Sequence, residues 1–114
     1  MKIDIKKSIK PVNYNYAIKF LEKKVVEVQE KKTNELIWIL EHPSIYTAGR
    51  RFRADEIIDK KIKIIKTLRG GKITWHGPGQ LICYFVIDLA KRNKDLRSFV
   101  KKIENSIIEV LEEY

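Results

Sequence analysis

The sequence predicts an α/β (α+β) domain in which a mixed β-sheet is flanked by helices. Near each end of the chain, apolar residues recur every three or four positions, which is typical of amphipathic helices. Between these segments, short apolar runs of strand length alternate with turns rich in Gly and Pro. With 114 residues, the chain has the size of one domain, and we expect residues 1–114 to form a single domain.

The first half of the chain predicts one helix followed by two strands. The helix is expected from Tyr14 to about Lys31, with Asn13 as a candidate N-cap. Residues 35–41 form a continuous apolar run between two glutamates, which predicts a strand buried on both faces. This strand stops at a His-Pro pair, and residues 44–48 predict a second short strand.

The second half predicts further strands and a final helix. Residues 54–59 fit a short helix at most, and the alternation over residues 61–66 indicates a half-exposed strand. Residues 81–89 are almost wholly apolar and predict a central strand. Asp95 is expected to cap a last helix whose apolar residues form one stripe.

The most informative stretch is residues 69–79, Arg-Gly-Gly-Lys-Ile-Thr-Trp-His-Gly-Pro-Gly, which holds four of the five glycines. Two glycine pairs around Lys72 to Trp75 predict a short strand with permissive turns at both ends. A plain hairpin gives the same pattern. Arg69 and His76 would lie at the two ends of this strand, and they make it the candidate functional site.

Composition limits the classes of partner and location. The 24 Lys and Arg against 15 Asp and Glu give a net charge of +9, which attracts acidic partners, nucleic acid among them. The lysines are scattered among glutamates without a stacking platform, so a solvated surface explains them equally well. The amino terminus lacks a signal-peptide core and no apolar tract could span a membrane, so we expect a cytoplasmic protein. The single cysteine, Cys83, lies in an apolar run and is expected in the core.

Four stretches, taken in order, resemble the lipoyl(octanoyl) transferases, which are octanoyl-[acyl-carrier-protein]:protein N-octanoyltransferases. They are Glu-His-Pro at 41–43, Thr-Ala-Gly-Arg-Arg at 47–51, the sequence of residues 69–80, and Tyr84 with Asp-Leu at 88–89. The resemblance extends from about Tyr14 to the end of the chain. It implies the amino-terminal part of an octanoyltransferase catalytic domain, with the biotin and lipoate protein ligase fold incomplete in this chain.

The resemblance implies an acyltransferase of lipoate biosynthesis and protein lipoylation. The octanoyl donor would be octanoyl-acyl carrier protein, and the acceptors would be lysines of the lipoyl domains of 2-oxoacid dehydrogenases and of the glycine cleavage H protein. In this family a cysteine thiolate carries the acyl group as a thioester and a lysine serves as general acid and base. Both family residues would lie beyond Tyr114, so no catalytic residue is expected in this chain, and the chain alone is expected to be inactive.

The implied reaction requires neither metal nor cofactor, and neither nucleic acid nor membrane is expected as a partner. The alternative is a non-catalytic module that binds acyl carrier protein or lipoyl domains.

By the same resemblance, the chain supplies substrate-binding residues of the acyl pocket. His76 and Tyr84 would line the site near the reacting carbon. Two roles are equally open for Arg69: it binds the substrate, or it fixes the loop by hydrogen bonds to main-chain carbonyls. Lys72 is expected to face solvent, and His42 is expected to be structural rather than catalytic. Arg50 and Arg51 either meet an acidic carrier or form a solvated turn. The implied substrate-binding residues are Arg69, Gly70, Gly71, Lys72, Ile73, Thr74, Trp75, His76 and Tyr84.

Overall fold

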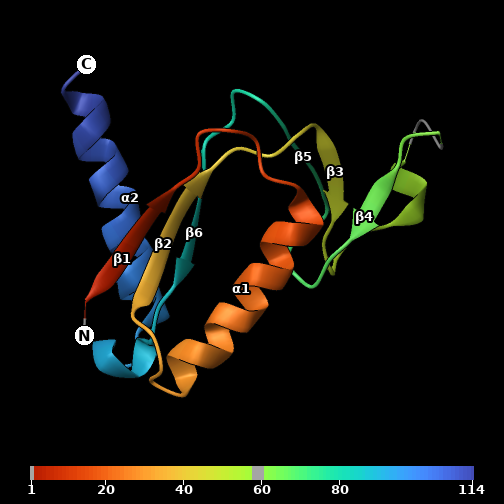
Figure 1. The fold of residues 1–114 in the computed structure, drawn as a ribbon. Helices are drawn as coiled ribbons and strands as arrows, with labels where there is room; N and C mark the ends of the chain where they lie inside the picture. The colour runs from red at the N-terminus through yellow and green to blue at the C-terminus, as the bar shows by residue number, and fades with distance from the viewer. Residues whose placement is uncertain (1, 58–60) are drawn as a thin grey trace.

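The computed structural model describes residues 2–57 and 61–114. Its strands form two small sheets, and helices pack beside them (Figure 1). The expectation of a mixed α/β fold is confirmed. In chain order the elements are β1 (Ile3–Lys7), α1 (Tyr14–Gln29), β2 (Glu35–Leu40), β3 (Ile45–Ala48), the 3₁₀ turn η1 (Ala54–Glu56), β4 (Ile64–Lys66), β5 (Ile73–His76), β6 (Ile82–Val86), the 3₁₀ turn η2 (Leu89–Arg92) and α2 (Leu96–Glu112).

The first sheet has the strand order β1-β2-β6 and carries the main core. β1 is parallel to β2, and β6 is antiparallel to β2. Helix α1 begins where predicted, because the Asn13 side chain accepts a hydrogen bond from the Tyr16 N–H at 3.1 Å. Its inner face meets one face of β2. The residues buried in this core are Ala17, Val28, Leu36, Trp38, Leu40 and Val86.

Strand β2 is buried on one face, not on both as predicted. Leu36, Trp38 and Leu40 point toward α1, and because side chains alternate along a strand, Ile37 and Ile39 point to the opposite face. These two isoleucines are only half-buried. The other side of this sheet is therefore incompletely covered in the described chain.

Strand β6 departs from two predictions. The strand is shorter than the predicted residues 81–89, and it pairs only with β2, so it lies at an edge of the described sheet rather than at its centre. Cys83 was expected in the core but is exposed, because it points away from α1 while its neighbours Ile82 and Tyr84 pack on the core.

Strand β1 was not predicted. Its residues alternate charge with apolar side chains, Ile-Asp-Ile-Lys, which is a period of two that indicates a strand. The strand adds to β2 in parallel, and beyond its end the Ser8 hydroxyl accepts a hydrogen bond from the Trp38 indole N–H at 3.0 Å.

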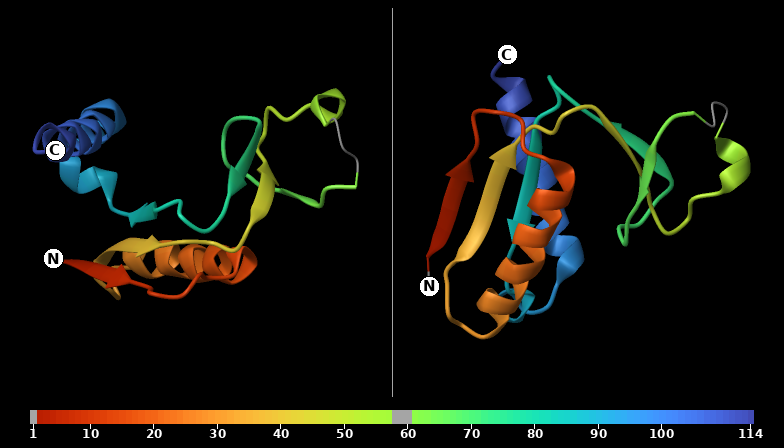
Figure 2. Two further views of the ribbon diagram at one scale, coloured as in Figure 1. Left: turned by 90° about the horizontal axis from the view of Figure 1, so that it is seen from above. Right: turned by 45° about the vertical axis from the view of Figure 1, so that its right-hand side comes forward.

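The second sheet has the order β4-β3-β5 and lies beside the first sheet and α1 (Figure 2). The predicted strands 44–48 and 72–75 correspond to β3 and β5, which are antiparallel neighbours. β4 flanks β3 on the other side, so β5 does not form a plain hairpin with the strand before it. The predicted strand 61–66 is ordered as a strand only at Ile64–Lys66. The predicted short helix 54–59 is a 3₁₀ turn at Ala54–Glu56, and its last two residues lie outside the described residues.

Helix α2 confirms the predicted cap, because the Asp95 carboxylate accepts a hydrogen bond from the Ser98 N–H at 3.0 Å. None of the α2 residues is buried. The helix lies on the side of the first sheet opposite α1, where the Phe99 ring meets the Phe85 ring edge-on at a centroid separation of 5.9 Å (Figure 2).

A partly buried ion pair joins β2 to the segment that leads into α2. Glu35 is 2% exposed, and its two carboxylate oxygens accept hydrogen bonds from the Arg92 guanidinium at 2.7 and 2.9 Å. The Asp88 N–H donates to the same carboxylate at 2.5 Å. These contacts lower the pKa of Glu35 from 4.5 to about 2, and the hydrogen bonds from Arg92 make the largest contribution.

We expect Glu35→Gln to lower the free energy of unfolding by about 2 to 3 kcal/mol at pH 7, because Arg92 loses its charged partner. Since the folded pKa of Glu35 is below its ordinary value, the stabilisation is present above about pH 4.5 and is lost as the pH falls toward 2. Urea unfolding at pH 7 and pH 3 measures both effects. The exposed pair of Asp55 with Arg53 supplies the control, Asp55→Asn, which should change stability by about 0.5 kcal/mol or less. A mutational difference that stayed the same at both pH values would contradict this assignment.

Candidate functional site

The guanidinium of Arg69 is held by protein atoms alone. It donates to the Thr47 hydroxyl from Nε at 3.1 Å and from Nη2 at 2.8 Å, and to the Thr47 carbonyl from Nη2 at 2.8 Å. It also donates to the carbonyls of Gly70 at 2.7 Å and Lys72 at 2.8 Å. These contacts use its fork of donors to fix the loop before β5 onto β3. Of the two roles that the sequence left open for Arg69, the geometry favours the structural one.

The loop after β3 and the loop before β5 form one unit. The Gly49 N–H donates to the Lys72 carbonyl at 2.8 Å, and the Arg51 N–H donates to the Gly71 carbonyl at 2.9 Å. The Arg50 N–H donates to the Arg69 carbonyl at 2.9 Å, while the side chains of Arg50 and Arg51 are exposed. Main-chain hydrogen bonds therefore join the stretch at residues 47–51 to the stretch that begins at residue 69.

Strand β5 divides its side chains between two faces. Thr74 and His76 lie on one face, and Ile73 and Trp75 lie on the other, because side chains alternate along a strand. The Trp75 indole N–H donates to the Ser44 hydroxyl at 2.8 Å. The indole ring lies so close to Gly77 that a Cβ atom there would come within 2.1 Å of it.

Lys72 and Gly71 lie at the start of β5, away from His76. The Lys72 ammonium is exposed and forms an ion pair with Glu56 at 3.1 Å. Gly71 has a φ of +88°, which L side chains rarely adopt, and Gly70 has open space around it.

The end of β5 belongs to a cluster of four rings, Tyr14, His42, His76 and Tyr84. The His76 ring stacks on the Tyr14 ring with a centroid separation of 6.5 Å and an interplanar angle of 9°. The His42 ring lies 5.2 Å from Tyr14, 6.3 Å from His76 and 5.8 Å from Tyr84, all measured between centroids. The cluster thus brings together α1, the end of β2, β5 and β6.

Within this cluster, His42 and Tyr84 form a closed pair. His42 is fully buried, its Nδ1 lies 2.7 Å from the Val12 carbonyl and its Nε2 lies 2.7 Å from the Tyr84 hydroxyl. Because a carbonyl only accepts, Nδ1 carries the proton, and the Tyr84 hydroxyl donates to Nε2 of the neutral ring. Burial lowers the pKa of His42, which favours this neutral form, and raises the pKa of Tyr84 to about 12.

His76 has one ring nitrogen available. Its Nδ1 lies 2.9 Å from Oε1 of Gln80, whose amide nitrogen is directed at the Trp75 carbonyl 3.4 Å away. Nδ1 therefore donates to Gln80, and Nε2 has no hydrogen bond from any residue in 2–57 or 61–114. Beside it, burial raises the pKa of Tyr14, while the Arg69 charge and a Thr67 hydrogen bond act in the opposite direction. The cluster thus presents one imidazole nitrogen that can act on a bound group.

Two members of this site were missed as such by the sequence reasoning. Tyr14 was taken only as the start of the helix. The signal that was missed is an aromatic side chain directly after the N-cap, at the amino terminus of α1. Glu41 was noticed only as part of Glu-His-Pro, and its carboxylate accepts a hydrogen bond from the Gly79 N–H. That contact fixes the turn after β5 onto the end of β2.

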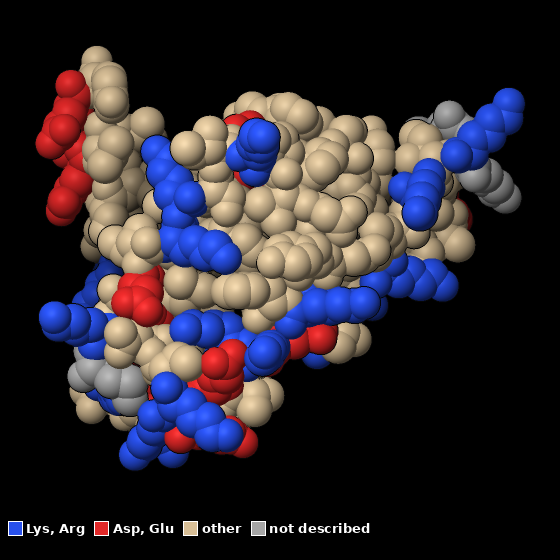
Figure 3. Space-filling model, in the orientation of Figure 1, with Lys and Arg blue, Asp and Glu red and all other residues tan. Residues whose placement is uncertain are grey.

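Two further kinds of site, membrane-spanning and metal-binding, were compared with the described residues. Neither α1 nor α2 is long and apolar enough to cross a membrane. Among the residues that the structure describes, no three His, Cys, Asp or Glu side chains gather into a group that could hold a metal ion. Lys and Arg side chains are spread over the face shown in Figure 3, with Asp and Glu among them.

Comparison with known proteins identifies relatives over nearly the whole chain. The family model described as the lipoyl protein ligase A/B catalytic domain matches residues 13–114. An octanoyltransferase of Wolbachia sp. subsp. Brugia malayi is 45% identical over 104 residues, which are 90% of this chain and 51% of that protein. An octanoyltransferase of Novosphingobium aromaticivorans is 38% identical over 112 residues, which are 98% of this chain and 50% of that protein. The chain spans about half the length of the curated relatives it matches.

Proposed function

The chain belongs to the lipoyl protein ligase A/B catalytic domain family, and from this premise we propose that it supplies part of an octanoyltransferase active site. The reaction would move an octanoyl group from acyl carrier protein to a lysine of a lipoyl domain. The names of the relatives support octanoyl transfer. The donor and the acceptor are part of the proposal.

The observation that carries this proposal is the ring cluster at the end of β5. His76 Nε2 faces no protein partner in the described chain, whereas both His42 nitrogens, the Tyr84 hydroxyl and His76 Nδ1 are hydrogen-bonded. A partly buried site with one acceptor nitrogen left for the ligand is suited to receive an N–H of a bound group, such as the amine of the acceptor lysine.

The covalent steps are assigned to residues that this chain does not provide. In the proposed sequence a cysteine thiolate attacks the carbonyl of the octanoyl thioester and expels the thiolate of the carrier protein, which takes a proton from the general acid. The amine of the acceptor lysine then attacks the enzyme thioester, forms the amide, and releases the thiolate, while a general base removes the amine proton. The cysteine and the lysine that performs the proton transfer would come from the part of the relatives that this chain does not cover.

Cys83 is a poor candidate for the thiolate. It points to the sheet face opposite α1, whereas its neighbour Tyr84 points into the ring cluster. Its sulfur atom and His76 therefore lie on different sides of β6.

The exposed Arg50 and Arg51 and the net charge of +9 suit a partner with an acidic surface, as proposed for the carrier protein. The competing proposal, a module that binds the carrier protein or lipoyl domains without chemistry, predicts binding but no transfer.

We test the function with a chimera in which residues 13–114 replace the matching segment of the Wolbachia octanoyltransferase from Brugia malayi. We expect the chimera to add an octanoyl group to a lipoyl-domain lysine when supplied with octanoyl-acyl carrier protein, as measured by intact mass. The 114-residue chain alone should give no transfer. A folded chimera that binds both proteins without transfer would favour the non-catalytic alternative, and transfer by the chain alone would refute the assignment of the thiolate to the missing part.

A further inference from the structure

The positive charge of the chain is concentrated in the segment that contains β4. Residues 50–72 hold nine Lys and Arg and three Asp and Glu, so they carry six of the nine net positive charges of the chain. Figure 2 shows this segment projecting away from the first sheet and from α2, and Figure 3 shows Lys and Arg side chains over it. An excess of one sign on one part of a surface attracts a partner of the opposite sign and steers its approach.

Three of these cations lie together near the start of β5. Arg50 and Arg51 follow the end of β3, and Lys66 lies at the end of β4, beside the end of β3. All three side chains are exposed, and none of them forms an ion pair with a residue in 2–57 or 61–114. By contrast, the nearby Arg53 and Lys72 have acidic partners. The three unpaired cations are therefore available to a partner with carboxylates on its surface.

Two apolar side chains lie among these cations. The Lys66 ammonium lies over the Phe52 ring, 5.7 Å from its centroid, and Leu68 is 79% exposed. The main chain beneath them is fixed, because hydrogen bonds join the loop after β3 to the loop before β5. We call Arg50, Arg51, Phe52, Lys66 and Leu68 the basic patch. A rigid cationic surface with apolar contacts suits an acidic surface of a folded protein.

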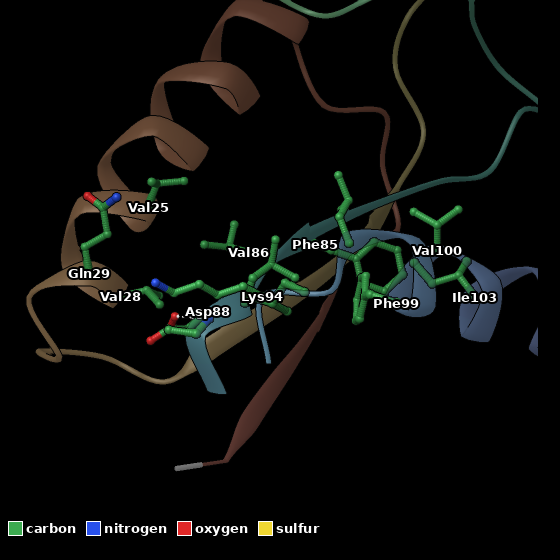
Figure 4. A pocket seen from close by; sticks show the side chains of 14 residues that line it. Val25, Val28, Gln29, Phe85, Val86, Asp88, Lys94, Phe99, Val100 and Ile103 are labelled. Carbon is green, nitrogen blue, oxygen red and sulfur yellow. Dashed lines mark hydrogen bonds between the residues drawn. The ribbon is translucent and has the colours of Figure 1, made fainter. Parts of the chain in front are cut away.

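The apolar hollow beside β6 has no such charge. It encloses about 740 Å³ and is lined by apolar side chains of α1, β6 and α2 (Figure 4). Among the described residues that line it, the charged ones are Asp88 and Lys94, which have opposite signs. Charge complementarity therefore favours the basic patch over this hollow as the place where an acidic protein binds.

The position of the basic patch distinguishes between the two proposed protein substrates. The Arg51 N–H donates to the Gly71 carbonyl just before β5, whereas His76 is the last residue of β5. The residues from Lys72 to His76 span roughly 13 Å of extended chain. The acceptor lysine has only a four-carbon stem, so the lipoyl domain must bind next to His76. A carrier protein presents its acyl group as a thioester on a long prosthetic arm, so the donor can bind at the far end of β5.

We propose that the basic patch is the docking surface for the acidic acyl carrier protein, and that the lipoyl domain binds separately, at the end of β5. This inference rests on the octanoyl transfer proposed above, because it assigns a place to the donor of that reaction. Nucleic acid would suit the charge but not the apolar part of the patch. The Phe52 ring is half-buried beside the Lys66 ammonium, and Leu68 is aliphatic, so neither offers an exposed aromatic platform on which bases could stack.

The test measures binding, and transfer is assayed separately. The 114-residue chain is titrated with acyl carrier protein, with a lipoyl domain and with a short DNA duplex, at about 50 and about 200 mM salt. We expect the carrier protein to bind, and its affinity to fall by at least about fivefold at the higher salt. Bound carrier protein should slow amide hydrogen exchange by at least about threefold over residues 49–52 and 66–68, but not over residues 3–7.

The double substitution Arg50→Glu with Arg51→Glu should weaken carrier binding by at least about tenfold, because like charges would then meet. The matched control, Lys101→Glu with Lys102→Glu, makes the same change of net charge at exposed positions of α2, and at the higher salt it should weaken binding less than about twofold. Both variants should keep the circular dichroism spectrum of the unmodified chain. Binding of the lipoyl domain should change by less than about twofold in either variant.

Four outcomes would overturn the proposed docking surface. They are no binding of the carrier protein, equal weakening by the control, a loss of lipoyl-domain binding as large as the loss of carrier binding, and tighter binding of the duplex than of the carrier protein at both salt concentrations. If the patch variant binds the carrier normally while the chimera transfers octanoyl groups, the docking surface is wrong and the proposed function stands. If the carrier binds at the patch and the chimera transfers nothing, the docking surface stands and the proposed function is wrong.

Discussion

Gly49→Ala is expected to lower the free energy of unfolding of the chain by about 3 kcal/mol or more, and to disorder the second sheet first. A Cβ atom at position 49 would lie 2.4 Å from the Gly71 carbonyl oxygen and 2.6 Å from the Gly70 carbonyl oxygen. Both oxygens belong to the main chain and are themselves held, the first by the Arg51 N–H and the second by the Arg69 guanidinium. The added methyl group can therefore be accommodated only by breaking some of these hydrogen bonds.

Gly70→Ala is the matched control for this change. A Cβ atom at position 70 would meet no other atom within 4 Å, and the residue does not need a positive φ. The two substitutions add the same methyl group to the same pair of joined loops, so their difference isolates the close approach at Gly49. We expect Gly70→Ala to change the free energy of unfolding by about 0.5 kcal/mol or less.

Denaturant unfolding of the 114-residue chain, combined with hydrogen exchange at residues 45–48 and 73–76, measures this effect. The exchange rates should rise in both segments for Gly49→Ala and stay unchanged for Gly70→Ala. Equal stability of the two variants would show that the loop after β3 and the loop before β5 are not packed as the structure has them.

Local chemistry made much of the fold predictable from the sequence. The start of α1 and the start of α2 follow from Asn13 and Asp95, whose side chains accept hydrogen bonds from the first turn of each helix. Strand β2 follows from its apolar run, β5 from the glycine pairs on either side of it, and β3 from its place between a proline and a glycine. These signals depend on neighbours in the chain, and a single sequence contains them.

What depended on contacts between distant segments was not predictable in the same way. The sequence gives β6 the apolar character of a central strand, yet in the described chain the strand lies at an edge, because nothing is paired with its outer side. Cys83 was misplaced for the same reason, since an apolar run on a strand with one uncovered face was taken for a buried one. β1 was overlooked because its charges suit the surface of an edge strand as well as a loop.

The sequence singled out the candidate site only as a region. The stretch at residues 69–79 was singled out by its glycines, and it does hold the strand that carries His76. The sequence did not show that Arg69 and His76 have different roles. This difference depends on Thr47, which occupies donors of Arg69, and on Gln80, which fixes one nitrogen of His76. Pairings across 22 residues, as between Arg69 and Thr47, leave no local pattern.

In the octanoyltransferase chimera, His76→Phe is expected to slow octanoyl transfer by about 10- to 100-fold with little loss of stability. Phenylalanine keeps a ring against Tyr14 and the main-chain pairing of position 76 with Ile45, but it removes the nitrogen that is open toward a bound group. The amine of the acceptor lysine gains positive charge as it attacks, and one hydrogen bond from it to Nε2 would contribute about 1.5 to 3 kcal/mol, which corresponds to this range of rates.

The companion variant, Tyr84→Phe, should behave in the opposite way. The Tyr84 hydroxyl donates to the buried Nε2 of His42 and is thereby engaged inside the protein. Its removal leaves a buried acceptor without a donor, so the free energy of unfolding should fall by about 1 to 3 kcal/mol while transfer by the folded chimera slows less than about fivefold. Rapid-quench rates of octanoyl transfer and urea unfolding of both chimeras separate the two effects. If Tyr84→Phe abolished transfer and His76→Phe left it unchanged, the reacting carbonyl would lie at the tyrosine hydroxyl and the open nitrogen of His76 would have no part in the reaction.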